Sequence, residues 1–337
     1  MTIDARAAAR PELGGVERWA RELSARLPAI APGRYRVARP PAALAHRAGH
    51  AWEQAVLPWA RSRLLLCPAN LAPLASRRTV VVIHDVAPLR EPSWYAPAYV
   101  RWQRFVLPRI ARRALRVLAP SHFARQELID LLGLDPGRIA VVPGGRDERF
   151  EPAADGERAR RELGLGDRRY VLTVGSQTAR KNLEALALAA RALAAEGIDL
   201  LAVGGTRPQF RDESPGGGLR RLGAVDDALL PGLYAGAEAF VLPSRYEGFG
   251  LPPLEALACG TPVVVSDLPP LREVCGDAAA AYVDPGDPAG FTAALLAAVA
   301  EPGSARTAGP ARAAAFTWDA TARGVDAEIA ALLAEIS

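Results

Sequence analysis

Short apolar runs alternate along the chain with longer stretches in which alanine and leucine recur at helical spacing. In the first half, Thr79–Asp85, Arg116–Pro120 and Ile139–Pro143 are almost continuously aliphatic. Strands that are covered by helices on both faces of a parallel sheet have this pattern. Glu12–Leu27 and Ser121–Leu132 have the pattern of helices, and the serine that opens the second is a suitable N-cap. The first half is therefore predicted to be built from βαβ units.

The same alternation starts afresh in the second half, after a stretch rich in charge, glycine, proline and alanine at 146–168. Helices such as Asn182–Glu196 separate the new strands, a loop is expected at 212–218, and a last helix is expected from beyond Pro310 to Ile336. Four further strands are predicted, at Tyr170–Val174, Leu200–Val203, Ala239–Pro243 and Pro262–Ser266.

These two series predict an α/β protein of two tandem Rossmann-like domains that face a cleft. We expect the first domain at 1–150 and the second at 169–310, with a linker at 151–168 and a C-terminal helix at 311–337. Clefts between domains and the carboxyl ends of parallel strands are where ligands bind. The candidate chemistry is therefore sought in the loops that follow the strands.

Composition narrows the class of protein. The chain has 337 residues, half of them hydrophobic and 23% charged, which suits two packed cores rather than a disordered protein. No apolar run approaches the roughly 18 to 20 uncharged residues of a membrane span, and no signal peptide is evident. The three cysteines are far apart and odd in number, which fits neither a disulfide framework nor a zinc site. We expect a reduced, cytoplasmic protein.

Positive charge is concentrated in the first half. Residues 1–150 carry 24 arginines and 12 acids, whereas the remainder carries 17 basic and 25 acidic residues. This asymmetry indicates an anionic partner for the first half: a phosphorylated acceptor, an anionic membrane surface or nucleic acid. An arginine-rich genome explains the same excess, because 40 of the 41 basic residues are arginine. Lys181, the single lysine, departs from that bias.

The strongest chemical signal is the segment 244–262, SRYEGFGLPPLEALACGTP. Its glycines follow a predicted strand and let backbone N–H groups approach a ligand closely. A helix then begins at Pro252-Pro253, where proline loses no hydrogen bond, and the helix N-terminus adds positive partial charge. The segment therefore predicts a ligand site.

Glu247 in this loop and Glu255 early in the helix can face the same cleft. Two carboxylates there can accept hydrogen bonds from neutral hydroxyls, or form an acid/base pair like that of glycoside hydrolases. A lone glutamate at a helix start would more simply complement the helix dipole. The surrounding segment favours a ligand role for both residues.

A second candidate is Arg180-Lys181-Asn182, between the strand Tyr170–Val174 and the next predicted helix. Side chains and a helix N-terminus can converge there on an anion such as pyrophosphate. A solvated Arg-Lys pair is the plainer alternative, but cations at a helix start oppose the dipole. A compact ammonium is not equivalent to a guanidinium in a tight phosphate pocket, which singles out Lys181.

Weaker candidates lie in the first half. Gly14-Gly15 follows the first strand and precedes a helix, where glycine lets a backbone N–H approach a ligand, although such a pair is usually only a turn. His84 ends a buried strand, so it either faces the cleft or is a satisfied core histidine. Asp85 beside it can orient the imidazole ring or bind an acceptor.

The sequence resembles the retaining glycosyltransferases of family 4, which have the two-domain GT-B fold. The resemblance covers essentially the whole chain, and the first half looks similar to bacterial mannosyltransferases. It implies that the C-terminal helix crosses back to the first domain. The motifs that carry it, in order, are Ile3-Asp4-Ala5-Arg6 with Gly14-Gly15, Trp52-Glu53-Gln54 with Leu57-Pro58, His84–Pro88, Ala119–Ser121, Val142–Gly145, Thr173–Ser176, Arg180–Asn182, Glu247–Glu255, Glu273 and Tyr282–Pro285.

The resemblance assigns roles in the second half. It implies that Glu247 contacts the hydroxyls of the donor sugar and that Glu255 contacts the ribose of the nucleotide. The sugar pocket would be completed by backbone groups of three residues, Phe249, Gly250 and Leu251.

The resemblance also implies a phosphate site. The backbone N–H of Gly15, after Gly14, would reach the distal phosphate of the donor. Many members carry arginine at the position of Ser176, so here Arg180 supplies the second charge or Ser176 donates a hydrogen bond. His84 would touch the donor sugar or the acceptor.

The implied reaction moves a hexose from a nucleotide-sugar to an acceptor hydroxyl of a glycan, a glycolipid or a small molecule. Mannose from GDP-mannose is favoured by the family likeness, with UDP-glucose, UDP-GlcNAc and dTDP-rhamnose as alternatives. The leaving phosphate itself can take the acceptor proton, so no dedicated base is expected. No DxD-type motif is present, so we expect neither a metal nor a cofactor. The basic half suits a lipid-pyrophosphate acceptor or peripheral contact with the inner face of the membrane.

Other classes of protein fit less well. A dehydrogenase would need G-x-G-x-x-G after its first strand, and neither series has it. Nucleic-acid binding is disfavoured because aromatics are scarce and no basic-aromatic stripe is present. A phosphorylase of related fold would need a pyridoxal lysine, and the only lysine is already assigned. A non-catalytic protein that binds an anionic glycan, lipid or nucleic acid remains the competitor, against which the intact glutamate pair argues.

Overall fold

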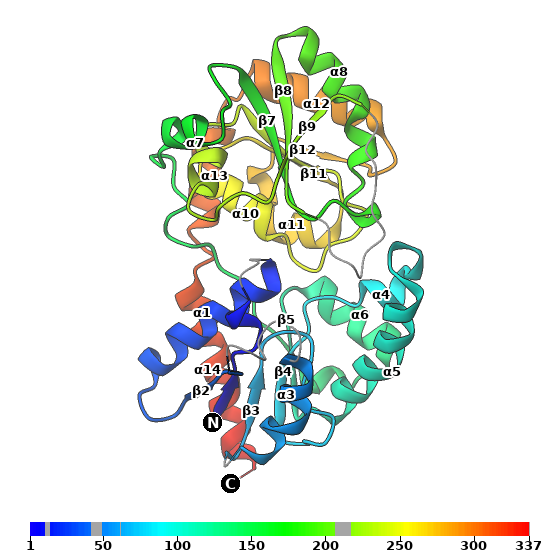
Figure 1. Ribbon diagram of the computed structural model, residues 1–337, viewed down its shortest axis with the longest axis vertical. Helices are drawn as coiled ribbons and strands as arrows, with labels where there is room; N and C mark the ends of the chain where they lie inside the picture. The colour runs from blue at the N-terminus through cyan, green and yellow to red at the C-terminus, as the bar shows by residue number, and fades with distance from the viewer. Residues whose placement is uncertain (11–13, 42–48, 61, 206–216, 337) are drawn as a thin grey trace. The chain divides into compact units, whose positions relative to one another are not determined.

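The computed structural model describes residues 1–10, 14–41, 49–60, 62–205 and 217–336 (Figure 1). The chain divides into two compact units. Unit 1 comprises Met1–Glu91, Pro97–Gly145 and Trp318–Ser337, and unit 2 comprises Pro92–Ala96 and Arg146–Thr317. Each unit has its own six-stranded sheet with parallel strand pairs, so the predicted α/β fold is confirmed.

Unit 1 orders its strands β2-β1-β3-β4-β5-β6. The chain passes from β1 to its neighbour β2 and then crosses to β3 on the other side of β1, so the sheet has a topological switch point between β1 and β3. Ligands of open α/β sheets bind outside the carboxyl ends of the strands at such a point. The strands are β1 Thr2–Asp4, β2 Arg36–Ala38, β3 Leu65–Cys67, β4 Thr79–Val82, β5 Arg116–Ala119 and β6 Ile139–Val141.

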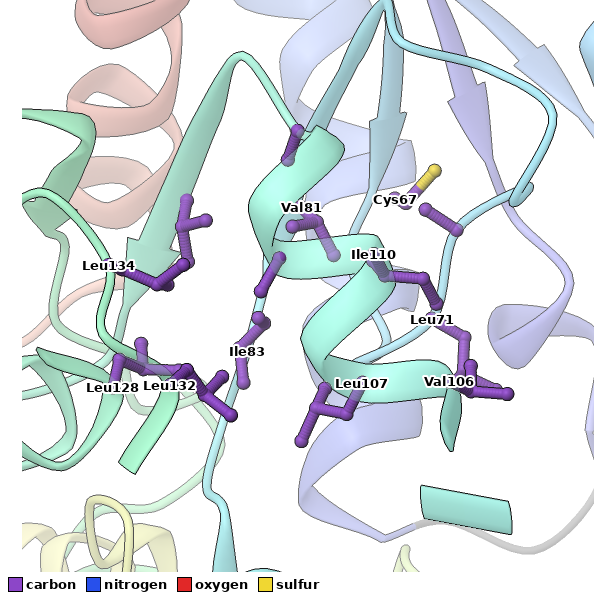
Figure 2. Packing of buried hydrophobic residues seen from close by; sticks show 14 of the residues in the cluster. Cys67, Leu71, Val81, Ile83, Val106, Leu107, Ile110, Leu128, Leu132 and Leu134 are labelled. Carbon is purple, nitrogen blue, oxygen red and sulfur yellow. The ribbon is translucent and has the colours of Figure 1, made fainter. Parts of the chain in front are cut away.

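Helices connect the parallel strands of this sheet and pack on it, as βαβ connections require. Figure 2 shows the core on one face, where Val106 and Ile110 of α5 lie against Val81 and Ile83. α14 packs on α1, with the ring of Trp19 at 5.5 Å from a ring of the last helix, so the C-terminal helix joins unit 1 as expected. The helices are α1 Gly15–Ile30, α3 Gly49–Ala55, α4 Ala87–Arg90, α5 Pro97–Arg113, α6 His122–Leu132 and α14 Trp318–Glu335, with short 3-10 turns η1 Ala7–Ala9, η2 Leu57–Trp59 and η4 Pro136–Arg138.

Unit 2 orders its strands β12-β11-β10-β7-β8-β9, so its switch point lies between β7 and β10. The strands are β7 Arg169–Val174, β8 Ile198–Val203, β9 Leu219–Gly223, β10 Ala239–Leu242, β11 Val263–Ser266 and β12 Ala281–Val283. The helices are α7 Gly156–Glu162, α8 Ala187–Ala195, α9 Leu230–Ala235, α10 Leu251–Ala258, α11 Pro269–Cys275, α12 Pro288–Ala300 and α13 Ala305–Ala313, with 3-10 turns η3 Pro92–Trp94, η5 Ala179–Lys181, η6 Leu183–Leu186 and η7 Gly276–Ala278.

The start of the helix predicted at Asn182–Glu196 is wrong. Asn182 has a φ of +56°, and two short 3-10 turns precede α8, which begins only at Ala187. Asparagine is one of the few residues that adopt the left-handed conformation readily, and here its side chain is hydrogen-bonded within the fold. The loop predicted at 212–218 lies mostly outside the described residues.

The C-terminal helix predicted beyond Pro310 is two helices. Pro310 lies inside α13, which ends at Ala313, and α14 begins afresh at Trp318. Proline removes a hydrogen bond of the preceding turn, whereas Asp319 in the first turn of α14 complements the helix dipole. The residues predicted as a linker contain α7 and belong to unit 2. No helix of the described residues has the length and apolar composition that crossing a bilayer requires.

Candidate active site

Glycine makes room for a buried lysine at the carboxyl end of β7. A Cβ on Gly175, which has a φ of +156°, would lie 3.0 Å from Cε of Lys181. A Cβ on Gly204, after β8, would collide with the carbonyl oxygen of Gly175. A larger residue at position 175 would therefore require the lysine to shift. A small pocket lies here, lined by Gly175, Ser176 and Lys181 among others.

Three predicted site residues meet at this point. The Nζ of Lys181 donates to Oε1 of Glu247 at 2.6 Å, and Nη1 of Arg180 donates to Oε2 at 3.0 Å. Ser244, a residue that the sequence analysis did not single out, donates its hydroxyl to Oε1 at 2.7 Å. Arg180 also donates to the carbonyl oxygen of Tyr246 at 2.9 Å. The switch point between β7 and β10 thus joins the lysine and the glutamate.

The electrostatics of this cluster fix the state of the glutamate. Burial alone would raise the pKa of Glu247, but the charges of Lys181 and Arg180 and the hydrogen bonds lower it to about 2. Glu247 is therefore an ionised hydrogen-bond acceptor at neutral pH and cannot act there as a general acid. Two cations lie around this one carboxylate, and cations at the mouth of a parallel sheet favour an anionic ligand.

Asn182 holds the segments around the cluster together. Its side chain is 1% exposed, and Nδ2 donates to the carbonyl oxygens of Pro243 at 2.9 Å and Pro285 at 2.8 Å. These carbonyls follow β10 and β12, so one amide connects the segments that leave two strands. The motif Arg180-Lys181-Asn182 singled out this asparagine as part of an anion site. Its observed role, to hold two loops together, could be seen only in the structure.

The glycine-rich loop after β10 has the expected form. Gly250 has a φ of +122°, and a Cβ there would lie 2.8 Å from a methyl carbon of Leu271. Phe249 is buried, with its ring 6.0 Å from that of Phe316, and Leu251 is the first residue of α10. Contact of this backbone with a sugar stays a prediction.

Glu255 lies in the second turn of α10, later than expected, and is 5% exposed. Its Oε2 accepts a hydrogen bond of 3.0 Å from the hydroxyl of Tyr234, on α9. The tyrosine orients this carboxylate, and its contact with a ribose stays a prediction.

The remaining candidates belong to unit 1. The N–H of Gly14 donates to Oε2 of Glu17 at 3.2 Å, so the helix caps itself there. Gly15 is the first residue of α1, where backbone N–H groups have no acceptor within the helix. The role of the Gly15 amide toward a phosphate stays a prediction.

His84 has the surroundings of a buried histidine. Its Nε2 lies 2.8 Å from the carbonyl oxygen of Pro68, and its ring meets the edge of Trp19 at 5.2 Å. A carbonyl only accepts, so Nε2 carries the proton. Burial lowers the pKa of His84. These contacts favour the core alternative. Asp85 accepts the N–H of Ala87 at 3.1 Å, and contact of either residue with a substrate stays a prediction.

Metal ligands do not gather in the described part of the chain: no three histidine, cysteine, aspartate or glutamate side chains there form a group that could hold an ion. The expected independence from metals stays a prediction.

Two family models and several known proteins match this sequence. The family model "Glycosyltransferase Family 4" matches residues 31–150, and "Glycosyl transferases group 1" matches residues 168–301. The chain is 32% identical to the O-antigen chain mannosyltransferase B of Escherichia coli, over 75% of this chain and 70% of that protein. It is 34% identical to the D-inositol 3-phosphate glycosyltransferase of Geodermatophilus obscurus, over 67% of this chain but only 54% of that protein.

Comparison with solved structures supports the fold. Sucrose-phosphate synthase from Thermosynechococcus elongatus matches with a TM-score of 0.73 and 21% identity, over 99% of this chain and 100% of that one. The Anabaena protein HepE, solved in complex with UDP and glucose, matches with a TM-score of 0.72 and 17% identity, over 98% of this chain and 99% of that one. At these identities the likeness concerns the fold alone.

Proposed function

Because the chain belongs to the group 1, family 4 glycosyltransferases, we propose that it moves a hexose from a nucleotide-sugar to an acceptor hydroxyl with retention of configuration. The family, the enzyme class and the GT-B fold that the motifs predict are confirmed. The donor, the acceptor and the stereochemistry are the content of the proposal.

The observation that carries the proposal is the buried cluster of Lys181, Arg180 and Glu247. An ionised carboxylate orients sugar hydroxyls, because it only accepts hydrogen bonds and they can donate them. The two cations beside it suit the diphosphate to which that sugar is attached. One cluster thus offers complementary groups to both parts of a nucleotide-sugar.

The same cations would assist the chemical step. Negative charge builds on the phosphate as the bond to the sugar breaks, and preorganised cations in a buried site stabilise that charge. Lys181 is held in place by Glu247 and by the close backbone of Gly175, so little reorganisation is needed. With its pKa near 2, Glu247 is a poor base at neutral pH, which supports proton transfer from the acceptor to the leaving phosphate.

Mannose from GDP-mannose is the proposed donor, and an acceptor hydroxyl on a glycan or glycolipid is the proposed partner. The likeness to an O-antigen mannosyltransferase supports this choice, while the HepE complex keeps UDP-glucose as the alternative. A thermal-shift and hydrolysis panel of GDP-mannose, UDP-glucose, UDP-GlcNAc and dTDP-rhamnose tests it. Stabilisation and slow hydrolysis by GDP-mannose are expected. A response to another donor would overturn the choice of sugar, and no response to any would favour a non-catalytic binding protein.

Catalysis is proposed to need no metal, because Lys181 and Arg180 place two positive charges at the proposed diphosphate site. The test is donor hydrolysis before and after dialysis against EDTA. An unchanged rate is expected, and strict dependence on added magnesium or manganese would contradict the proposal.

The basic half of the chain is proposed to meet an anionic partner, either the phosphate of a lipid-linked acceptor or the membrane surface itself. The excess of arginines over acids in residues 1–150 supports this.

A further inference from the structure

The helix α5 in unit 1 has an unusual composition. Its 17 residues include five arginines and neither aspartate nor glutamate. One side is firmly in the core, where Val106, Leu107 and Ile110 pack against β4 and α6 (Figure 2). The other side is free to present its side chains to a partner.

Aromatic side chains interrupt the charge of this outer side, so a short basic-aromatic stripe is present after all, contrary to the expectation from the sequence. Phe105 is 53% exposed and Trp102 is 37% exposed. Residues four apart lie on one strip of a helix, so Arg101, Phe105 and Arg109 follow one another. The guanidinium of Arg109 lies 3.7 Å from the centroid of the Phe105 ring. We call the exposed residues of this side the α5 face: Arg101, Trp102, Arg104, Phe105, Arg109, Arg112 and Arg113.

The arginines of the α5 face are not neutralised. In the described part of the chain, no carboxylate forms a salt bridge with any of them, and their hydrogen bonds go to backbone carbonyl oxygens, including those of Leu132 and Leu74. Some other arginines of unit 1 do have acidic partners, as the exposed Arg34 has Asp326 and the less exposed Arg116 has Glu335. Within the described residues, five arginines without a salt-bridge partner therefore lie together on this one helix.

A neighbouring segment extends the exposed aromatic surface. The ring of His50, on α3, lies 5.7 Å from that of Trp102, so α3 lies beside α5. α3 leads directly into Val56, which is 50% exposed, and Trp59, which is 82% exposed. Large apolar side chains with this exposure, in the same unit as a helix whose arginines have no salt bridge among the described residues, indicate a partner that is anionic and apolar at once.

We propose that the α5 face docks on the surface of a bilayer with anionic headgroups. Arginine binds headgroup phosphates, while phenylalanine and tryptophan enter the boundary between headgroups and acyl chains. A second copy of the chain would bring two arginine-rich faces together, and like charges would repel. This inference deepens the proposal of an anionic partner and does not depend on the donor chemistry.

The expected contributions follow from transfer and surface energetics. Each basic residue near an anionic surface strengthens binding by roughly fivefold. Removing two arginines should therefore weaken vesicle affinity by about 25-fold at low salt. Burying the ring of Phe105 should raise vesicle affinity by about tenfold or more, and this apolar contribution should persist at high salt.

The experiment is flotation with vesicles of phosphatidylcholine alone or mixed with phosphatidylglycerol. The variants are Phe105→Ser and the double change Arg101→Gln with Arg109→Gln. Neither touches the core or the candidate active site. The matched control is Leu188→Ser with Arg191→Gln on α8 of unit 2, where the leucine is 46% exposed. Thermal shift by the nucleotide-sugar monitors folding and donor binding in every variant.

We expect the unmodified chain and the control to float with the mixed vesicles only, and both α5 variants to lose binding while donor binding is unchanged. Absence of flotation with mixed vesicles would overturn the proposal. So would equal binding of the α5 variants, or flotation with neutral vesicles to the same extent. A dimer in light scattering that Phe105→Ser abolishes, without vesicle binding, would instead assign the face to a second copy.

Discussion

Asp4 connects the stability of unit 1 to pH. It ends β1 and is 2% exposed, as is Arg6, and Glu53 beside them is fully buried. The guanidinium of Arg6 donates to Glu53 at 2.6 Å, and Oδ1 of Asp4 accepts the backbone N–H of Arg6 at 2.9 Å. Two buried carboxyl groups thus lie beside one guanidinium, which donates a hydrogen bond to Glu53 alone of the two. Burial and then the charge of Glu53 raise the pKa of Asp4 from 3.8 to about 7, against the opposing charge of Arg6.

The direction of the effect follows from proton binding. Between pH 3.8 and about 7 the folded chain holds a proton on Asp4 that the unfolded chain has lost, so the free energy of unfolding falls as pH rises. A shift of about three pKa units corresponds to about 4 kcal/mol, fully lost above pH 7. Asp4→Asn cannot titrate, and its amide can donate to Glu53, so the variant should be more stable than the unmodified chain at pH 8 by up to about 4 kcal/mol.

The assay is urea unfolding followed by tryptophan fluorescence from pH 5 to pH 8. Five of the six tryptophans belong to unit 1, so the signal reports that unit. Burial, followed by the charges of Arg6 and Arg10, lowers the pKa of His50 to about 4. Its contribution has the opposite slope and cancels when variant and unmodified chain are compared at each pH. Asp135→Asn, an exposed aspartate of the same unit, is the control. If the advantage of Asp4→Asn did not grow between pH 5 and pH 8, the reasoning would be refuted.

Two further variants test the scaffold of the candidate active site. Gly175→Ala brings a Cβ to 3.0 Å from Cε of Lys181. Donor affinity in calorimetry should therefore fall by roughly tenfold or more, and the variant should lose about 1–3 kcal/mol of stability. An unchanged affinity would show that donor binding does not need the lysine in this position. Asn182→Ala removes two buried hydrogen bonds at a φ of +56° and should destabilise unit 2 by about 2–4 kcal/mol, seen as faster hydrogen exchange around 176–186. Asn182→Gly relieves only the backbone strain, so full rescue by glycine would contradict the role of the amide.

Much of the fold could be predicted because buried parallel strands are almost continuously apolar. β4, β5, β7, β10 and β11 lie where the pattern placed them. The edge strands were harder: β9 carries two exposed arginines and has a single neighbouring strand, so its sequence lacks the buried pattern. β2 has only three residues and none of them is buried.

The site could be predicted residue by residue but not as an assembly. Residue type singled out Lys181 and Glu247, but their contact depends on β7 and β10 being neighbours, which no local pattern reveals. Likewise Arg6 and Glu53, which lie 47 residues apart in the chain, form a buried ion pair. Nothing in the sequence indicates that their two motifs are in contact. Side-chain partners far apart in the chain follow from strand order, which the hydrophobic pattern does not specify.

Calorimetric titration with GDP and with GDP-mannose tests most directly whether Lys181 and Glu247 hold one nucleotide-sugar between them. Lys181→Met should lose affinity for both ligands, because both carry the diphosphate. Glu247→Gln should retain GDP but lose the extra affinity that the mannose provides. Arg245→Gln, an exposed cation paired with Glu184 nearby, is the control and should bind both ligands normally. Normal binding of both ligands by the Lys181 and Glu247 variants would contradict the account.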